Sequence, residues 1–171
     1  AYYTAGSGSA DGAITWTERF RIAADGQLTG GSDAQRNTTL GANAGDSFTG
    51  TDATDNTLYG YDAGTAITSG DANTAVGSYA LDANTTANNN TAVGYNALSA
   101  TTTGIRNSAL GSEALTANTT GQYNTAVGRK SLVTNTTGGS NTALGLNALF
   151  NNTTASYNTA VGTGCMEANT T

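Results

Sequence analysis

The chain has 171 residues with a formal net charge of −6, and charged residues make up only 11% of it. The six basic residues are spread thinly, which argues against nucleic acid as a partner because phosphate binding needs clustered Lys and Arg. No apolar run approaches the length of a membrane span, so membrane insertion is not expected. The low charge also disfavours a solvated, disordered chain, so apolar surface must be buried without a large conventional core.

Residues 1–30 are expected to form a lead-in region that contains a β-hairpin. Trp16, Phe20 and Ile22 share one set of alternate positions with Glu18, and Asp25-Gly26 is a strong turn signal. Arg19 and Arg21 share one face of this strand, which we interpret as a solvated face rather than a binding patch. Trp16 is interpreted as a packing residue rather than a platform for sugars.

Residues 31–72 form an irregular, acidic transition. They hold two loose copies, NTTLG from Asn37 and NTLYG from Asn56, of a phrase that becomes regular further along the chain. Paired carboxylates in Gly-rich loops suit Ca²⁺, but acidic turns that keep the protein in solution are the favoured interpretation. The Asp residues concerned are Asp33, Asp46, Asp52, Asp55, Asp62 and Asp71.

Residues 73–171 form a regular array with a period of 17 residues. Each unit opens with the phrase Asn-Thr/Ser-Ala-Val/Leu-Gly, whose first residues we call the Asn column. A second set, the Leu column, lies eight residues after each Asn. The Asn column consists of Asn73, Asn90, Asn107, Asn124, Asn141 and Asn158. The Leu column consists of Leu81, Leu98, Leu115, Leu132, Leu149 and Met166.

The array predicts an all-β protein, a β-solenoid or β-roll with one 17-residue unit per coil. The period is too short for the common helical repeats. Thr and Val favour strands, and Asn and Gly favour turns, so we expect two short strands per coil, NTAV and NALSA, followed by a turn through NTTG. Successive coils would pair at about 4.8 Å. The chain starts at Ala1 and stops within a repeat, so it is expected to be a fragment or a processed product.

Two features of the array point to how it is stabilised. Ala and Val are neighbours in each TAVG phrase and must face opposite sides of a strand, so both faces of the strand are apolar. The interior of the coil can bury one face, and another chain is expected to bury the other, which predicts an oligomer. The Asn column suits a ladder of stacked amides. The alternative, a row of metal ligands, is disfavoured because Ca²⁺ also wants carboxylates and the column holds none.

The phrases NTAVGYNAL…TTTG and NTALGLNALFNNTTASY resemble arrays in phage tail-fibre proteins and, more distantly, head repeats of bacterial trimeric autotransporter adhesins. The stretch WTERFRIAADGQL, residues 16–28, is similar to a segment that often precedes such arrays in tail fibres. The resemblance implies a parallel homotrimer in the tail fibre of a virion, outside the cell, that attaches to a host surface receptor, either a glycan or an outer-membrane component. A bacterial cell-surface adhesin is the alternative. The self-cleaving chaperone domain that commonly ends such proteins has no counterpart here.

The sequence offers little for catalysis, so no enzyme activity, cofactor or metal is expected. Without His there is no Ser-His-Asp arrangement and no histidine metal site. Cys165 is alone and stands where Ala or Ser stands in other repeats, which indicates a buried small residue. Glu113 and Glu167 are isolated, whereas a glycosidase needs two converging carboxyls. A depolymerase is therefore a minor alternative.

Recognition is expected at positions where the repeat varies. The variable residues carry aromatic, amide and guanidinium groups, which stack on or hydrogen-bond to sugars, although plain turn chemistry also explains them. The candidates are Tyr95, Arg106, Tyr123, Arg129, Lys130 and Tyr157. Ice binding is a further alternative, because a Thr row recurs in register, but these residues lie beside turns rather than along a strand. The row is Thr85, Thr102, Thr119, Thr136 and Thr153.

Overall fold

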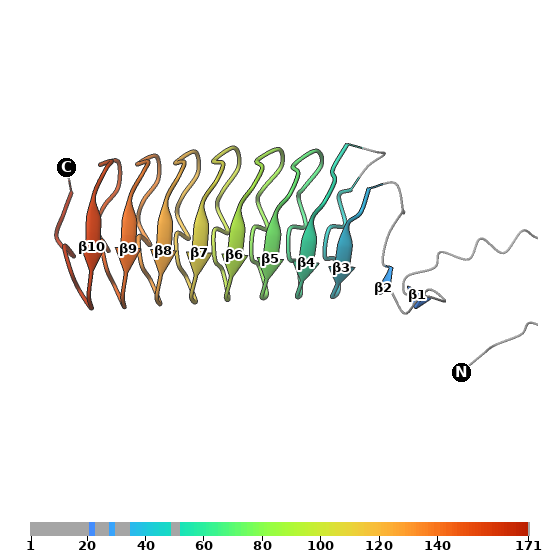
Figure 1. Cartoon of the computed structure of the whole chain (residues 1–171), viewed down its shortest axis with the longest axis horizontal. Coiled ribbons are helices and arrows are strands. Elements are labelled where there is room, and N and C mark those ends of the chain that lie inside the picture. The colour runs from blue at the N-terminus through green and yellow to red at the C-terminus, as the bar shows by residue number, and fades with distance from the viewer. Residues whose placement is uncertain (1–20, 23–27, 30–34, 49–51, 171) are drawn as a thin grey trace, which may run out of the picture.

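The structure, a computed structural model, describes residues 21–22, 28–29, 35–48 and 52–170. Its main feature is one parallel sheet of eight strands in sequence order, with one strand in each coil of a solenoid (Figure 1). The strands are β3 (Thr38–Leu40), β4 (Thr57–Tyr59), β5 (Thr74–Val76), β6 (Thr91–Val93), β7 (Ser108–Leu110), β8 (Thr125–Val127), β9 (Thr142–Leu144) and β10 (Thr159–Val161). No helix occurs in the described ranges. The predicted all-β parallel solenoid is confirmed.

A second, two-stranded sheet precedes the solenoid in the chain. Strand β1 (Arg21–Ile22) pairs antiparallel with β2 (Leu28–Thr29). Trp16, Arg19 and the Asp25-Gly26 turn of the predicted hairpin lie outside the described residues.

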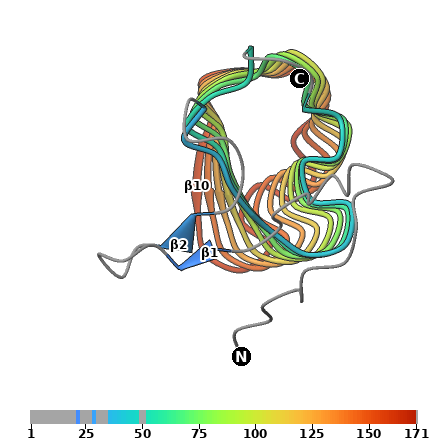
Figure 2. The ribbon, with the colours of Figure 1, turned by 90° about the vertical axis from the view of Figure 1, so that its right-hand side faces the viewer.

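The register of the sheet follows the sequence period. Val76 of β5 lies opposite Val93 of β6, and Thr74 opposite Thr91, so partners are 17 residues apart. The first coil is longer by two residues, because Thr38 of β3 pairs with Thr57 of β4. Seen along the stack, the coils superimpose with a gradual rotation (Figure 2). Equivalent residues of successive repeats therefore form columns along the solenoid.

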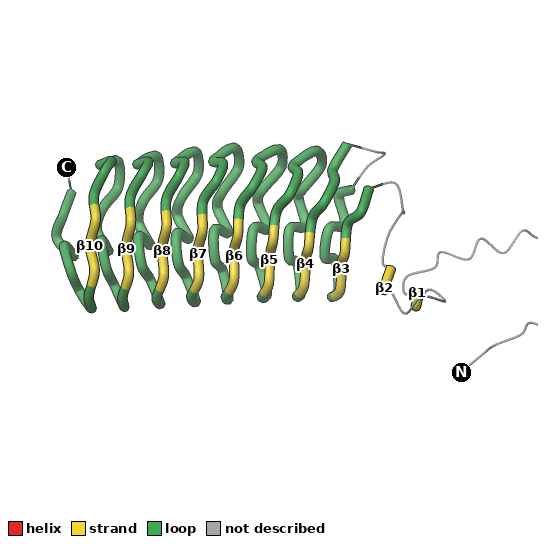
Figure 3. Tube along the Cα trace, viewed as in Figure 1, coloured by secondary structure: helices red, strands yellow, loops and turns green. Residues whose placement is uncertain are grey.

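Each coil contains one strand, so the prediction of a second strand over NALSA is wrong (Figure 3). Asn96 and Leu98 have φ values of 54° and 53°, which is left-handed and incompatible with a strand. The segment instead makes two successive turns, in which Ala97 N–H donates to the carbonyl of Gly94 and Thr101 N–H to that of Leu98. These turns also stack, because Leu98 N–H donates to the carbonyl of Ala114 in the next coil at 3.0 Å.

The core is a thin double column of Ala and Leu side chains. Every strand from β5 to β10 points its central Ala inward, and these Ala side chains are fully or almost fully buried. The residues Leu81 to Leu149 of the Leu column are fully buried, with φ between 51° and 54°. A left-handed L-residue costs about 1–2 kcal/mol. Burying a Leu side chain yields about 1.5–3 kcal/mol, which offsets that cost.

The coil between Asn56 and Ala72 fills the same interior with a different set of side chains. It has Gly64 where later coils have Leu, with φ of 57°. Leu58, on the strand, and Ile67, beyond the turn, supply the missing volume and are fully buried. A Cβ on Gly64 would lie 2.8 Å from the side chains of both. The side-chain volume lost at Gly64 is therefore replaced by Leu58 and Ile67, and the coil keeps the same cross-section.

The Gly after each strand is required by the close approach of neighbouring coils. Gly111 has φ of 144°, and a Cβ there would lie 2.6 Å from the carbonyl oxygen of Gly128 in the next coil. No side chain fits at that distance, so the repeat phrase must end in Gly.

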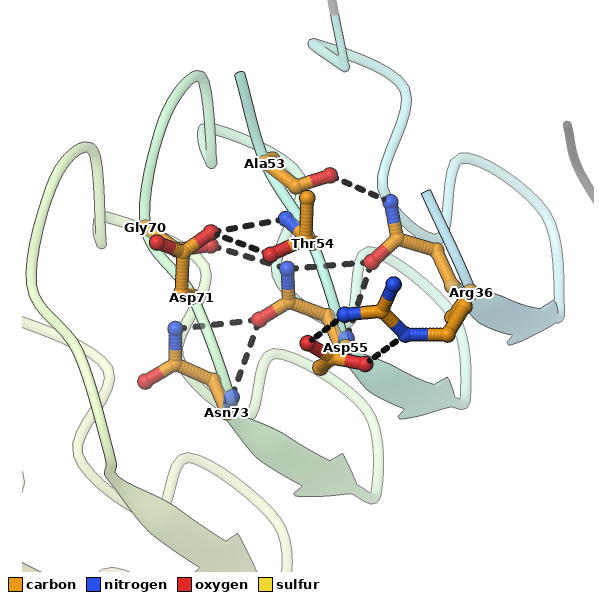
Figure 4. A network of polar contacts seen from close by, with 9 residues as sticks. Arg36, Ala53, Thr54, Asp55, Gly70, Asp71 and Asn73 are labelled. Carbon is orange, nitrogen blue, oxygen red and sulfur yellow. Dashed lines mark hydrogen bonds and ion pairs between the residues drawn. The ribbon is translucent and has the colours of Figure 1, made fainter. Parts of the chain in front are cut away.

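The Asn column forms a continuous buried ladder of hydrogen bonds. Oδ1 of Asn90 accepts from the backbone N–H of Asn107 at 2.9 Å and from its Nδ2 at 3.2 Å. Nδ2 of Asn107 also donates to the carbonyl of Gly121 in its own coil at 2.8 Å. The ladder starts at Asn37, next to the Arg36–Asp55 ion pair (Figure 4). Each amide therefore ties two coils together and closes its own coil.

A second buried amide ladder, which the sequence analysis did not identify, runs parallel to the first. Asn135 donates Nδ2 to Oδ1 of Asn118 at 3.0 Å, and Asn152 does the same to Asn135 at 2.9 Å. Asn135 also donates to the carbonyl of Gly138 at 3.0 Å, which closes the turn through NTTG. The recurrence of Asn in that phrase was the available signal.

Replacing Asn107 with Ala should destabilise the protein strongly. The change leaves the backbone N–H of Asn124 without its partner, breaks the bond from Asn124 Nδ2, and removes one of the two amide donors to the carbonyl of Gly121, which Asn118 still serves. An unsatisfied buried group costs about 1–3 kcal/mol, so we expect the free energy of unfolding to fall by about 3 kcal/mol or more. Urea titration followed by circular dichroism measures it.

The matched control is Asn158→Ala in the last coil. Asn158 donates to Asn141 but is only partly buried, so its loss should cost about 1 kcal/mol or less. Equal losses at the two positions would show that the ladder does not carry the stability assigned to it.

Candidate functional site

The outward face of the eight-stranded sheet carries two uninterrupted rows of side chains. On each strand the central residue is more buried than its two neighbours, which therefore face outward. We call the second outward row the apolar column: Leu40, Tyr59, Val76, Val93, Leu110, Val127, Leu144 and Val161. The first outward row is the Thr column: Thr38, Thr57, Thr74, Thr91, Ser108, Thr125, Thr142 and Thr159. Neither row contains a charge.

The apolar column stays partly solvent-exposed in the single chain. Leu110 is 51% exposed and Leu144 38%. Its residues are aligned in register over eight strands, so together they make one long apolar stripe rather than scattered contacts. An extended stripe of this kind is typical of an interaction surface.

A shallow groove lies elsewhere on the coils, in the segment just before the Asn column. It has a volume of about 250 Å³ and is flanked by two of the predicted binding residues, Tyr123 and Tyr157. Its remaining lining is polar and uncharged: Thr120, Gln122, Thr137, Gly139, Ser140 and Ser156. The structure thus brings two residues of one variable column to a common concave surface.

The groove exists because one coil carries small residues between two coils that carry large ones. Gly139 stands between Gln122 and Ser156, and Ser140 stands between Tyr123 and Tyr157, each one repeat apart. The backbone N–H of Gly139 donates to Oγ of Ser156 at 2.9 Å, which joins two coils at the floor. Sequence reasoning singled out the Tyr residues but missed the Gly-Ser gap that separates them.

Arg106 fixes one wall of the groove. Its guanidinium carbon lies 5.5 Å from the ring centroid of Tyr123, and its Nη1 donates to the Tyr123 hydroxyl at 2.7 Å. Arg106 therefore orients Tyr123 rather than lining the groove. Tyr157 on the other side is 85% exposed.

Tyr95, Arg129 and Lys130 are not part of this groove. Tyr95 packs edge-to-face on Tyr79, with ring centroids 6.1 Å apart, and extends an aromatic row that begins at Tyr61. Arg129 and Lys130 both lie near the carboxylate of Glu113, at 3.8 and 3.5 Å. The structure thus divides the predicted binding residues among three separate places.

Three acidic residues of the transition segment make contacts between coils. Asp55 forms a bidentate pair with Arg36, at 2.6 and 2.5 Å, which lowers the pKa of the carboxyl group. Asp71 accepts from the backbone N–H of Thr54 at 2.8 Å, and Asp62 accepts from Asn43 at 2.8 Å. In the part of the chain that the structure describes, no group of three potential metal ligands comes together. Asp33 lies outside it.

Asp82 is a half-buried acid in the regular array. Its Oδ1 is buried and has no hydrogen-bond partner among the described residues, and burial raises the pKa of its carboxyl group. The equivalent residue two coils later, Thr116, donates its hydroxyl to the carbonyl of Asn96 at 3.1 Å. A hydroxyl therefore satisfies this position where a carboxylate does not.

Replacing Asp82 with Thr should stabilise the protein at neutral pH. A raised pKa means that the fold disfavours the ionised form, so stability is lost as pH rises through the folded-state pKa and is intact below the ordinary value of 3.8. We expect a gain of about 1 kcal/mol at pH 7 that vanishes near pH 3. Urea titrations at the two pH values measure it. Asp52→Thr, at an exposed residue, is the control for the substitution itself and should change the free energy of unfolding by less than about 0.5 kcal/mol.

The Thr row beside the turns is occupied by structural contacts. Hydroxyls of Thr102, Thr119 and Thr136 each donate to the carbonyl of the equivalent Thr in the next coil, at 3.0 to 3.3 Å. Cys165 is free and partly buried against the core. Neither feature presents a reactive group to a ligand.

Fold and surface together define a parallel β-solenoid repeat protein with regular outward rows and a local groove. Comparisons of the chain with known protein families, with curated proteins and with solved structures find no match. Among the described residues there is also no helix whose length and apolar character would let it cross a membrane.

Proposed function

We propose that this chain is a structural and adhesive fibre segment that assembles as a parallel homotrimer, as in a phage tail fibre. The observation that carries the proposal is the apolar column, which runs the length of the solenoid and lacks cover in a single chain. The repeat phrases and the lead-in segment resemble those of tail fibres, and this supports the same assignment.

A second and third copy of the chain are the partners that fit this face best. A partner must match a row of side chains spaced by one coil, about 4.8 Å, over eight strands. Another copy has the same spacing and length. The chain carries a net charge of −6, yet the outward rows of the sheet hold no charged residue, so copies can meet there without direct repulsion.

The proposed role is host attachment from an extracellular position on a virion. A stacked, hydrogen-bonded rod is stiff and holds a binding surface at a distance from the particle. The variable residues on its outside recognise a glycan or an outer-membrane component. A trimeric adhesin on a bacterial surface uses the same physical design and is the alternative setting.

Charged residues in the apolar column should prevent assembly. In the variant Leu110→Lys/Leu144→Lys, two lysines would have to be buried without partners at the interface. We expect sedimentation equilibrium to give three times the 17.0 kDa of one chain for the unmodified protein and a single-chain mass for the variant.

Leu146→Lys is the matched control. Leu146 is an equally exposed leucine, at 41%, but it follows Gly145 outside the strand, so this variant should stay trimeric. Circular dichroism checks that the solenoid is intact in both variants. A single-chain mass for the unmodified protein would refute the trimer.

Ice binding is a second candidate that the sheet face favours. The Thr column and the apolar column place Thr and Val alternately outward along β5, β6, β8 and β10 of a regular parallel sheet. The sequence analysis located Thr only beside the turns and missed this row. A face buried in a trimer cannot contact ice, so the two functions exclude each other at this surface.

Thermal hysteresis separates these two candidates. A trimeric fibre should show no thermal hysteresis, which is a difference between the melting and the freezing temperature of ice in the solution. A monomeric protein with a hysteresis that is lost in Thr91→Lys, on the exposed Thr column, would support ice binding and overturn the fibre.

A further inference from the structure

We propose that the groove between Tyr123 and Tyr157 binds a single neutral hexopyranose unit of a glycan. This deepens the proposed function, on which it rests for the idea that the chain attaches to a surface.

The spacing of the two tyrosines suits one ring between them. They stand two coils apart, which is about 10 Å along the stack. A ring in van der Waals contact on both faces needs about 7–8 Å between its neighbours. Tyrosines one coil apart leave no such room, because Tyr79 and Tyr95 already touch at a centroid distance of 6.1 Å. Ser140 in the intervening coil keeps the space open.

The lining matches the two kinds of surface that a pyranose presents. Aromatic faces carry a negative quadrupole and attract the C–H faces of a sugar ring. Thr120, Thr137 and Ser140 supply hydroxyls, and Gln122 supplies an amide, for the sugar hydroxyls at the ring edge. Gly139 lets the ligand approach the backbone at the floor.

The electrostatics favour a neutral sugar over an acidic one. No residue that lines the groove is charged. The nearby guanidinium of Arg106 is already bound to the Tyr123 ring and hydroxyl. The chain as a whole is acidic. Sialylated, uronic or phosphorylated units therefore find no counter-charge here.

The open shape of the groove implies weak binding at each site. A single shallow contact holds one residue of a glycan loosely, and several copies on one particle would raise the apparent affinity by avidity. Binding is therefore detected best on surfaces that display the glycan densely.

The test uses an array that displays glucosides, galactosides, mannosides and N-acetylglucosaminides beside sialylated, uronic and phosphorylated glycans. The purified chain should bind at least one neutral class. Tyr157→Ala removes a wall, and Ser140→Tyr fills the gap. Ser140 has φ of 57°, close to the 59° and 64° of Tyr123 and Tyr157, so the backbone accepts Tyr there. Both variants should bind about tenfold more weakly or worse. Tyr61→Ala, in the separate aromatic row, should bind normally.

Three results would overturn the site: no binding to any neutral glycan, binding only to acidic glycans, or binding that both groove variants leave unchanged. A change of assembly mass in Ser140→Tyr would also overturn it, because the groove would then be covered by another copy. The fibre proposal is judged apart from this, by the mass of the unmodified chain. A monomer that binds neutral glycans through Tyr157 would support the glycan site and refute the fibre. A trimer that binds no neutral glycan would support the fibre and refute the glycan site.

Discussion

The structure depends on the in-register stacking of buried Asn side chains from coil to coil. A typical amide of the Asn column, such as that of Asn90 or Asn107, bonds to the next Asn along the column and to a backbone carbonyl of its own coil. These contacts form only when each repeat places an Asn at the equivalent position, and they also form across the longer first coil between Asn37 and Asn56. The regular period keeps these Asn side chains in register from coil to coil.

The interior contributes less than in an ordinary globular domain, because it is only wide enough for one Leu and two Ala side chains per coil. The chain accepts left-handed backbone at residues such as Leu115 to point a large side chain into that space. Where it uses Gly64 instead, Leu58 and Ile67 restore the volume. The coil cross-section is thus conserved even where the sequence is not.

Because the solenoid is so regular, a small sequence change in one repeat alters the surface at that coil. Uniform residues on the strands give straight rows, and these suit a partner with the same spacing. A break in uniformity gives a local site, as at Gly139 and Ser140, where two small residues open a groove between tyrosines. In the proposed fibre, regular positions would serve assembly and irregular positions would serve recognition.

The sequence by itself determined the solenoid, its period, and the columns of Asn and Leu, because residues that recur at a fixed period stack in register from coil to coil. It did not determine that NALSA is a pair of turns, since β-propensity does not report the left-handed φ of Asn96 and Leu98. Nor did it distinguish Tyr123 and Tyr157, which share a groove, from Tyr95, which packs on Tyr79. Only the tertiary structure decided these points. Whether side chains of different coils touch or leave a groove depends on the size of the side chains in the coil between them, and this becomes visible only when the coils are stacked.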